Sequence, residues 1–297
     1  MRIGTLLSQQ TKPFVSFEFF PPAEESQLPA FYAVVKELQK MNPLFVSVTY
    51  GAGGSKQDKT LAVTRELVRM GLTTMAHLTC IGATEESIRS FLEALQEAGV
   101  DNVLALRGDP PRNTEWKPQS LFFRHASDLV RCIRLAYPSM GIAVAAYPTP
   151  HPESASYAED RHRTAEKLAQ GADFAITQLF FDVREYVAMV ERLRANHCSQ
   201  PIIPGILTIQ SFAGLRRILS LSDAHIPGKL YLALEEADAK GGASAVREAG
   251  IRFAADEITR LLDAGAPGVH LYTLNRADIC TELCERTGLA PKEGFCV

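Results

Sequence analysis

Residues 104–111 read Leu104-Ala105-Leu106-Arg107-Gly108-Asp109-Pro110-Pro111, an apolar run that passes directly into a charged pair and a turn. The run at 101–107 is too short for a helix of ordinary length, and the Gly and Pro residues after it end any strand. It therefore predicts a short buried strand with an acid, Asp109, just beyond its end. In a parallel α/β protein, sites are built where the carboxyl ends of the strands emerge, so this position favours a functional acid.

Similar short strands alternate with helical patterns along the whole chain. The expected strands are 14–19, 44–49, 73–79, 101–107, 141–147, 174–178, 201–206 and 269–273. The expected helices are 27–41, 56–70, 85–98, 126–136, 156–170 and 183–195, then helical stretches up to about 264 and a last helix from about 276. This alternation predicts an α/β fold, a (β/α)8 TIM barrel that residues 1–297 form as a single domain, with extra helices between strands seven and eight.

A doubly wound sheet is the alternative fold. It usually places a Gly-x-Gly-x-x-Gly turn after its first strand, and here Phe20-Pro21-Pro22 stands at that position. The barrel is therefore the preferred prediction.

Composition excludes several classes of function. The chain has 46% hydrophobic and 22% charged residues and a formal net charge of -3, with Lys and Arg scattered along it. We expect no nucleic-acid partner, and no apolar run approaches the roughly 18 residues of a membrane span, so we expect no membrane partner and a cytoplasmic location. The six cysteines form no Cys-x-x-Cys pair, which favours free, mostly buried thiols.

Polar residues stand at or just after the expected strand ends, and in a barrel they converge on one mouth. They are Glu18, Thr49, His77, Arg107, Asp109, Tyr147, His151, Gln178, Tyr272 and Arg276. Alternation places Glu18 on the same face as the small Ser16, pointing inward, where burial favours the protonated carboxyl group that a general acid needs. The alternative is a structural glutamate paired with an arginine such as Arg107.

The other members of this set also have structural alternatives. Asp109 can simply cap the turn before Pro110, and Gln178 can be a satisfied core amide instead of a partner for a heterocycle edge. His77 and His151 have no histidine at i+4, so we expect no metal. The turn Gly51-Ala52-Gly53-Gly54 can bind a phosphate or be an ordinary tight turn. The absence of a lysine at a strand end argues against a Schiff-base aldolase.

Several segments together resemble the 5,10-methylenetetrahydrofolate reductases, in that family's order and from the first strand to the last. They are Phe17-Glu18-Phe19-Phe20-Pro21-Pro22, Val48-Thr49-Tyr50-Gly51-Ala52, His77-Leu78-Thr79-Cys80, Leu104-Ala105-Leu106-Arg107-Gly108-Asp109, Ala146-Tyr147-Pro148, Ile176-Thr177-Gln178, Pro204-Gly205-Ile206 and Tyr272-Thr273-Leu274-Asn275-Arg276. The resemblance covers essentially the whole chain.

The resemblance implies a barrel that holds FAD and passes a hydride from NADH or NADPH to methylenetetrahydrofolate in a ping-pong reaction, which feeds one-carbon metabolism and methionine synthesis. It implies Glu18 and Asp109 as catalytic residues, and Glu18, Asp109, Gln178, Tyr272 and Arg276 as the residues that face folate. The implied FAD contacts are Thr49, His77, Leu106, Arg107, Gly108, Asp109, Ala126, Ala145, Tyr147, His151, Asp160 and Lys167. Among these, Lys167 and His151 would serve the phosphates and Asp160 a sugar hydroxyl.

Two positions depart from the family pattern. His125 beside Ala126 stands where better-known members carry a tyrosine, and Ile218 replaces an aromatic residue, with Phe212 nearby in the sequence. A proline-dehydrogenase-like flavin barrel and a flavin-binding subunit without turnover remain alternatives. The choice among NADH, NADPH and a partner protein as donor stays open. A homo-oligomer is the default expectation.

Overall fold

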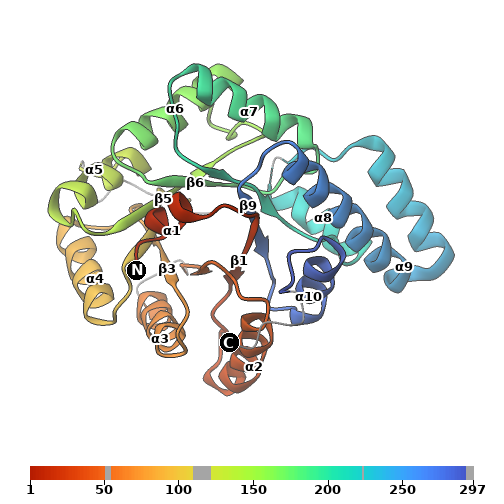
Figure 1. Cartoon of the computed structure of the whole chain (residues 1–297), viewed down its shortest axis with the longest axis horizontal. Coiled ribbons are helices and arrows are strands. Elements are labelled where there is room, and N and C mark those ends of the chain that lie inside the picture. The colour runs from red at the N-terminus through yellow and green to blue at the C-terminus, as the bar shows by residue number, and fades with distance from the viewer. Residues whose placement is uncertain (51–54, 110–121, 223, 292–297) are drawn as a thin grey trace.

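The computed structural model describes residues 1–50, 55–109, 122–222 and 224–291. Within these ranges, nine parallel strands form a barrel in the order β7-β6-β5-β4-β3-β2-β1-β9-β8, with helices around it (Figure 1). The strands are β1 Phe14–Phe19, β2 Val46–Val48, β3 Thr74–Thr79, β4 Asn102–Leu106, β5 Gly141–Ala146, β6 Phe174–Thr177, β7 Ile202–Ile203, β8 Gly205–Ile206 and β9 Gly268–Tyr272. The predicted TIM barrel is confirmed.

The prediction of one continuous strand at 201–206 was wrong, because Pro204 divides it into β7 and β8. Proline has no N–H to donate to a ladder, so the strand changes partner there. The first half pairs with β6 and the second half with β9, which closes the ring. Across this junction, the Gly205 N–H donates to Thr177 Oγ1 at 2.9 Å, and the Tyr272 hydroxyl donates to the Thr177 carbonyl at 2.6 Å.

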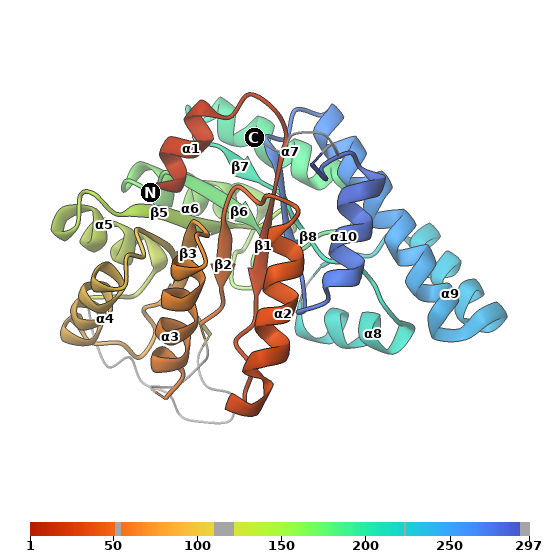
Figure 2. The same cartoon turned by 60° about the horizontal axis from the view of Figure 1, so that its bottom comes forward.

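The outer helices follow the predicted order closely. They are α2 Leu28–Gln39, α3 Ser55–Arg69, α4 Glu85–Glu97, α5 Ala126–Ala136, α6 Tyr157–Ala169, α7 Val183–Ala195 and α10 Ala277–Arg286, with a 3-10 turn at Glu25–Gln27 before α2. The expected extra helices are α8 Phe212–Leu221 and α9 Gly228–Asp263, which extend to one side of the barrel (Figures 1 and 2). A positive φ of 60° at Gly242 bends α9. Within the described ranges, no helix combines the length and apolar character that crossing a bilayer requires.

The sequence patterns did not predict α1, Ile3–Gln9, which lies where the strands begin (Figure 2). The Ile3 N–H donates to Asn102 Oδ1 at 2.8 Å, and Arg2 pairs with Asp173 at 2.8 Å. Ile3 and Leu7 are buried against apolar side chains inside the barrel. This helix therefore closes the end of the barrel opposite the expected site.

The alternation predicted for the first strand is confirmed. Val15, Phe17 and Phe19 belong to the core between the strands and the outer helices. Ser16 and Glu18 are also buried, but they are on the opposite, inward face. The strand thus supplies apolar packing outward and polar groups inward.

Candidate active site

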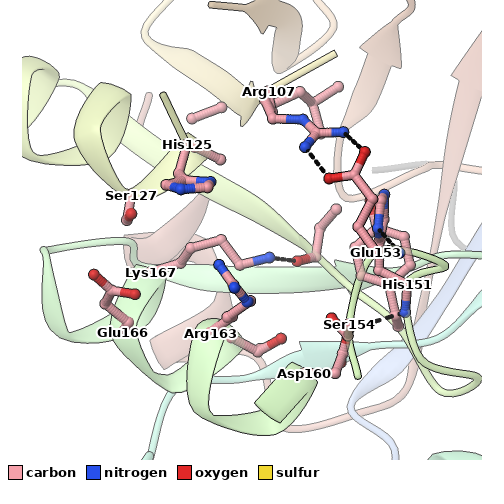
Figure 3. Close-up of a pocket in the computed structure, with 16 residues that line it drawn as sticks. Arg107, His125, Ser127, His151, Glu153, Ser154, Asp160, Arg163, Glu166 and Lys167 are labelled. Carbon is pink, nitrogen blue, oxygen red and sulfur yellow. Dashed lines mark hydrogen bonds and ion pairs between the residues drawn. The ribbon is translucent and has the colours of Figure 1, made fainter. Parts of the chain in front are cut away.

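Two adjoining hollows lie at the carboxyl ends of the strands. The barrel mouth is lined by Glu18, Thr49, His77, Leu104, Leu106, Arg107, Gly108, Asp109, Ala145, Tyr147, His151, Ile176, Thr177, Gln178 and Tyr272. The lateral cleft, between α5 and α6, is lined by Ala105, Leu106, Arg107, His125, Ala126, Ser127, Ala145, Tyr147, His151, Glu153, Ser154, Asp160, Arg163, Thr164, Glu166 and Lys167 (Figure 3). The two hollows share Leu106, Arg107, Ala145, Tyr147 and His151, so they form one continuous site.

The fold brings nearly all of the residues singled out in the sequence to this site. Those in the barrel mouth alone are Glu18, Thr49, His77, Gly108, Asp109, Gln178 and Tyr272, and those in the lateral cleft alone are Ala126, Asp160 and Lys167. Arg276 is the exception, because it lines neither hollow. Its half-exposed guanidinium pairs with Asp278 at 3.2 Å and reaches Gln210 at 3.4 Å.

Glu18 is buried at the inner end of the barrel mouth. The suggested partner Arg107 was wrong, because the Arg107 guanidinium donates two hydrogen bonds to the carboxylate of Glu153 instead. Glu18 Oε2 lies 3.4 Å from His77 Nε2 and 3.7 Å from His270 Nε2. The acid therefore faces two imidazole rings.

The fully buried His270 was missed in the sequence. The signal was available, since His270 precedes Tyr272 by two residues and shares its face of the strand. Its ring stacks on Phe45 with centroids 5.5 Å apart and planes 15° apart. Ser16 and Ser47 contact its two nitrogens at 2.8 Å and 3.2 Å.

Burial lowers the pKa of His77, because desolvation disfavours the imidazolium form. The nearby Glu18 carboxylate opposes this shift and His270 adds to it. His77 is thus a neutral imidazole at pH 7, with one ring N–H available as a donor. Its Nε2 lies 3.3 Å from Ser47 Oγ.

Lys167 lines the lateral cleft and is half-buried there (Figure 3). Burial lowers its pKa to about 8, an effect that the carboxylates of Asp160 and Glu166 oppose. Its Nζ donates to the Ala145 carbonyl and lies 5.6 Å from the centre of the Tyr147 ring. An ammonium group has three N–H donors, so it retains donors for an anionic ligand.

The buried pair Asp160 and Arg161 fixes the loop that follows β5. Asp160 accepts from the His151 N–H at 3.0 Å and from Arg161 at 2.8 Å. Arg161 donates to the carbonyls of Tyr147 and Pro148. Burial, with the charges of Asp109 and Asp160, raises the pKa of Tyr147 to about 12, so this ring keeps its hydroxyl proton at neutral pH.

The outer rim of the barrel mouth is polar and open. Asp109 and Gln178 are exposed there, and Gln178 Oε1 accepts from the Leu179 N–H at 3.0 Å. The Tyr272 hydroxyl is engaged with Thr177, and burial raises its pKa. A ligand at this rim therefore meets the Asp109 carboxylate and the Gln178 carboxamide.

The two departures from the family pattern fall in different places. His125 precedes α5, its N–H donates to Asp128 at 3.0 Å, and it lines the lateral cleft. Ile218 packs in the apolar cluster between α8 and α9, where Phe212 is buried, and neither lines the barrel mouth. The glycine-rich turn at 51–54 lies outside the described residues, and so does the last of the six cysteines, Cys296. No group of three or more potential metal ligands occurs within the described part of the chain.

The family model and the curated relatives agree on one family. The model of the family described as "Methylenetetrahydrofolate reductase" matches residues 2–288. The chain is 33% identical over 288 residues to the "5,10-methylenetetrahydrofolate reductase" of Pectobacterium carotovorum subsp. carotovorum, covering 97% of this chain and 94% of that protein. It is 36% identical over 281 residues to "Methylenetetrahydrofolate reductase (NADH) 1" of Arabidopsis thaliana, covering 91% of this chain and 47% of the plant protein.

A solved structure shares the fold at low sequence identity. It is described as an uncharacterized protein from Clostridium thermocellum that binds two copies of 5-methyl-5,6,7,8-tetrahydrofolic acid. The TM-score is 0.66 at 12% identity, and the match covers 97% of this chain and 98% of that one.

Proposed function

The chain belongs to the methylenetetrahydrofolate reductase family, and from that premise we propose that it reduces 5,10-methylenetetrahydrofolate to 5-methyltetrahydrofolate with FAD and a reduced nicotinamide. The observation that carries the proposal is the buried Glu18 at the inner end of the barrel mouth, adjoining a cleft with cationic side chains. The reaction consumes one hydride and one proton per folate. The site offers an acid for the proton and a place for a hydride carrier.

The lateral cleft suits FAD because its donors match the parts of that cofactor. Lys167 and His151 would bind the phosphates, and the half-buried ammonium of Lys167 would supply charge-assisted N–H donors. Asp160 would accept from a sugar hydroxyl in addition to holding the His151 loop. Thr49, His77, Leu106, Arg107, Gly108, Asp109, Ala126, Ala145 and Tyr147 would complete the contacts. The bound flavin supplies reversible two-electron hydride chemistry.

Folate would occupy the barrel mouth. Methylenetetrahydrofolate accepts a hydride after its five-membered ring opens to an iminium cation, and ring opening requires a proton on the leaving nitrogen. Glu18 would donate that proton as general acid, and the exposed Asp109 carboxylate would stabilise the cation. Gln178 would hold the pterin edge through its carboxamide group. Tyr272 would contact folate through its ring, and Arg276, which lies outside the lining, would have to leave Asp278 to do so.

NADH is the donor that the comparisons favour. The name of the Arabidopsis relative specifies NADH, although this chain spans about half of that protein. The reduced nicotinamide would deliver its hydride and depart before folate enters the same mouth. This order is the ping-pong scheme.

The test is an anaerobic visible spectrum of the purified protein, recorded before and after NADH and again after methylenetetrahydrofolate. Flavin bands that bleach with NADH and return with folate are the expected result. Bands that bleach but do not return with folate would contradict the proposal and favour another flavin barrel, such as a proline-dehydrogenase-like enzyme, or a subunit without turnover. A protein that binds no FAD would overturn the assignment of the lateral cleft.

A further inference from the structure

A chain of polar side chains crosses the barrel interior beneath Glu18. It consists of Ser16 on β1, Ser47 on β2, His77 on β3 and His270 on β9, all of them buried. Ser16 Oγ lies 2.8 Å from His270 Nδ1, and Ser47 Oγ lies 3.2 Å from His270 Nε2 and 3.3 Å from His77 Nε2. The interior of such a barrel is usually filled by branched apolar residues, so this polar layer requires an explanation.

The hydrogen bonds determine which nitrogen of each ring holds the proton. Ser16 Oγ donates to the Val269 carbonyl at 3.1 Å, so it accepts from the Nδ1–H of His270. Nε2 of His270 is then the acceptor for the Ser47 hydroxyl. Having donated its own proton, Ser47 accepts from His77 Nε2–H. Every donor in this arrangement has an acceptor.

One end of this chain reaches the acid. His77 Nε2 lies 3.3 Å from Ser47 Oγ and 3.4 Å from Glu18 Oε2, so its N–H points between the two. If the His77 proton were on Nδ1 instead, the lone pair of Nε2 would face the Glu18 carboxylate. The proton on His270 Nδ1 therefore determines, through Ser47 and His77, that His77 presents an N–H donor to the Glu18 carboxyl group.

We propose that His270 is a positioning residue for the reduction of folate: through Ser47 and His77 it holds the Glu18 carboxyl group in the orientation for proton transfer. The inference rests on the proposed function and adds a residue that does not line the site. Because His270 contacts neither hollow, it acts on the substrate only through Glu18. It acts in the proton-dependent half-reaction and not in flavin reduction by nicotinamide.

The environment of His270 makes the effect depend on pH. The titratable groups that face it are Glu18 on β1, His77 on β3 and Tyr272 on its own strand, whose ring centre lies 5.8 Å away. The other contacts, Ser16, Ser47 and Phe45, do not titrate in the ordinary range. Loss of His270 removes a ring that disfavours protonation of His77, so the pH profile of the folate half-reaction should move.

The test uses the FAD-loaded His270→Phe variant, which keeps an aromatic ring against Phe45 but removes both nitrogens. The flavin is reduced with dithionite, so that the identity of the donor does not matter, and is then mixed anaerobically with methylenetetrahydrofolate. We expect reoxidation to slow by about 100-fold, as for a misplaced catalytic group. Reduction of the same variant by NADH should stay within about twofold of the parent, because hydride transfer to the flavin does not need the Glu18 proton.

Three further substitutions separate hydrogen bonding from packing. His270→Gln places an amide near the Nε2 position and should restore most of the rate, whereas His270→Asn reaches only the Nδ1 position and should not. Phe45→Leu removes the stacked ring and leaves the hydrogen bonds, so it should leave reoxidation nearly unchanged. If Phe45→Leu slows reoxidation as much as His270→Phe does, the role is packing and the proposal is wrong.

Other outcomes also decide the question. If His270→Phe does not fold, Ser47→Ala replaces it in the test, because it removes the oxygen that links His270 to His77. Ser47→Ala should slow reoxidation by folate and leave flavin reduction by NADH unchanged. Parent-like reoxidation and an unmoved pH profile in these variants would overturn the role of His270 and leave the proposed function intact. Failure of the parent protein itself to reoxidise with folate would overturn both.

Discussion

The barrel interior has two layers that differ in chemistry although the same strands build them. The lower layer is apolar; it starts near the strand beginnings and reaches the barrel mouth at Leu104 and Ile176. It contains Ile3, Leu7, Phe14, Phe45, Met75, Leu104, Ala143, Phe174, Ile176 and Ile203. The upper layer contains Ser16, Ser47, His270, His77 and Glu18. Along β1 the inward-facing residues are Phe14, Ser16 and Glu18. The first belongs to the apolar lower layer, and the other two belong to the polar upper layer.

The two layers contribute differently to the stability of the fold. Each large side chain buried in the lower layer contributes about 1.5–3 kcal/mol through its removal from water. The upper layer buries polar groups, which costs free energy unless every donor and acceptor is paired. The pairing among Ser16, Ser47, His77 and His270 limits that cost and leaves the Glu18 carboxyl group at the open end.

The largest expected effect comes from the top of the upper layer. Glu18→Gln keeps the shape of the side chain but removes the proton that opens the folate ring, so folate-dependent reoxidation should fall by about 10³-fold or more. Flavin reduction by NADH should remain, which a stopped-flow measurement of each half-reaction would check. Equal loss of both half-reactions would assign Glu18 to flavin binding and refute its role as the acid.

The lower layer should respond in the opposite way. Phe174→Ala empties a fully buried position and should lower the free energy of unfolding by about 3–5 kcal/mol, measured by urea denaturation. Leu135→Ala, at a side chain that is 79% exposed, is the matched control and should change little. The folate half-reaction of the folded, flavin-loaded Phe174→Ala protein should stay near that of the parent. A loss of turnover at constant flavin content would contradict the view that the lower layer serves stability and the upper layer serves catalysis.

A smaller effect is expected in the lateral cleft, at Lys167. Its pKa of about 8 means that the positive charge is present below that pH and is lost above it. Affinity of the apoprotein for FAD should therefore fall by about tenfold as pH rises from 7 to 9, since one charge-assisted contact to a phosphate weakens. Lys167→Met should bind FAD more weakly at pH 7 and show a flat profile. Titration of each apoprotein with FAD, followed by flavin fluorescence, measures the affinity at each pH. If the affinity of Lys167→Met falls as steeply with pH as that of the parent, Lys167 is not the cause of the pH dependence.

Much of the fold could be predicted from local patterns. The strands and outer helices were identified from apolar periodicity and turn residues. The split of the seventh strand was missed even though Pro204 was visible. A proline shows that one ladder bond is lost, but only the barrel geometry shows that the strand changes partner there.

The candidate site was predictable in its members but not in its pairings. Alternation placed Glu18 inward, yet its suggested partner Arg107 bonds Glu153, and its actual neighbours include the unforeseen His270. These contacts join residues far apart in the chain, and no local pattern encodes them. The loop that contains Glu153 lies beside Arg107 only because β4 and β5 pair.

The sequence by itself determined the order of strands and helices and which side of each strand is polar, because a period of two residues is a local property of the backbone. Tertiary structure decided which polar groups meet. The pairing of Glu18 with Tyr272 across β1 and β9 brings His270 beneath the acid. Closure of the ring sets that register, because hydrogen-bond pairing and burial must be satisfied for all strands together.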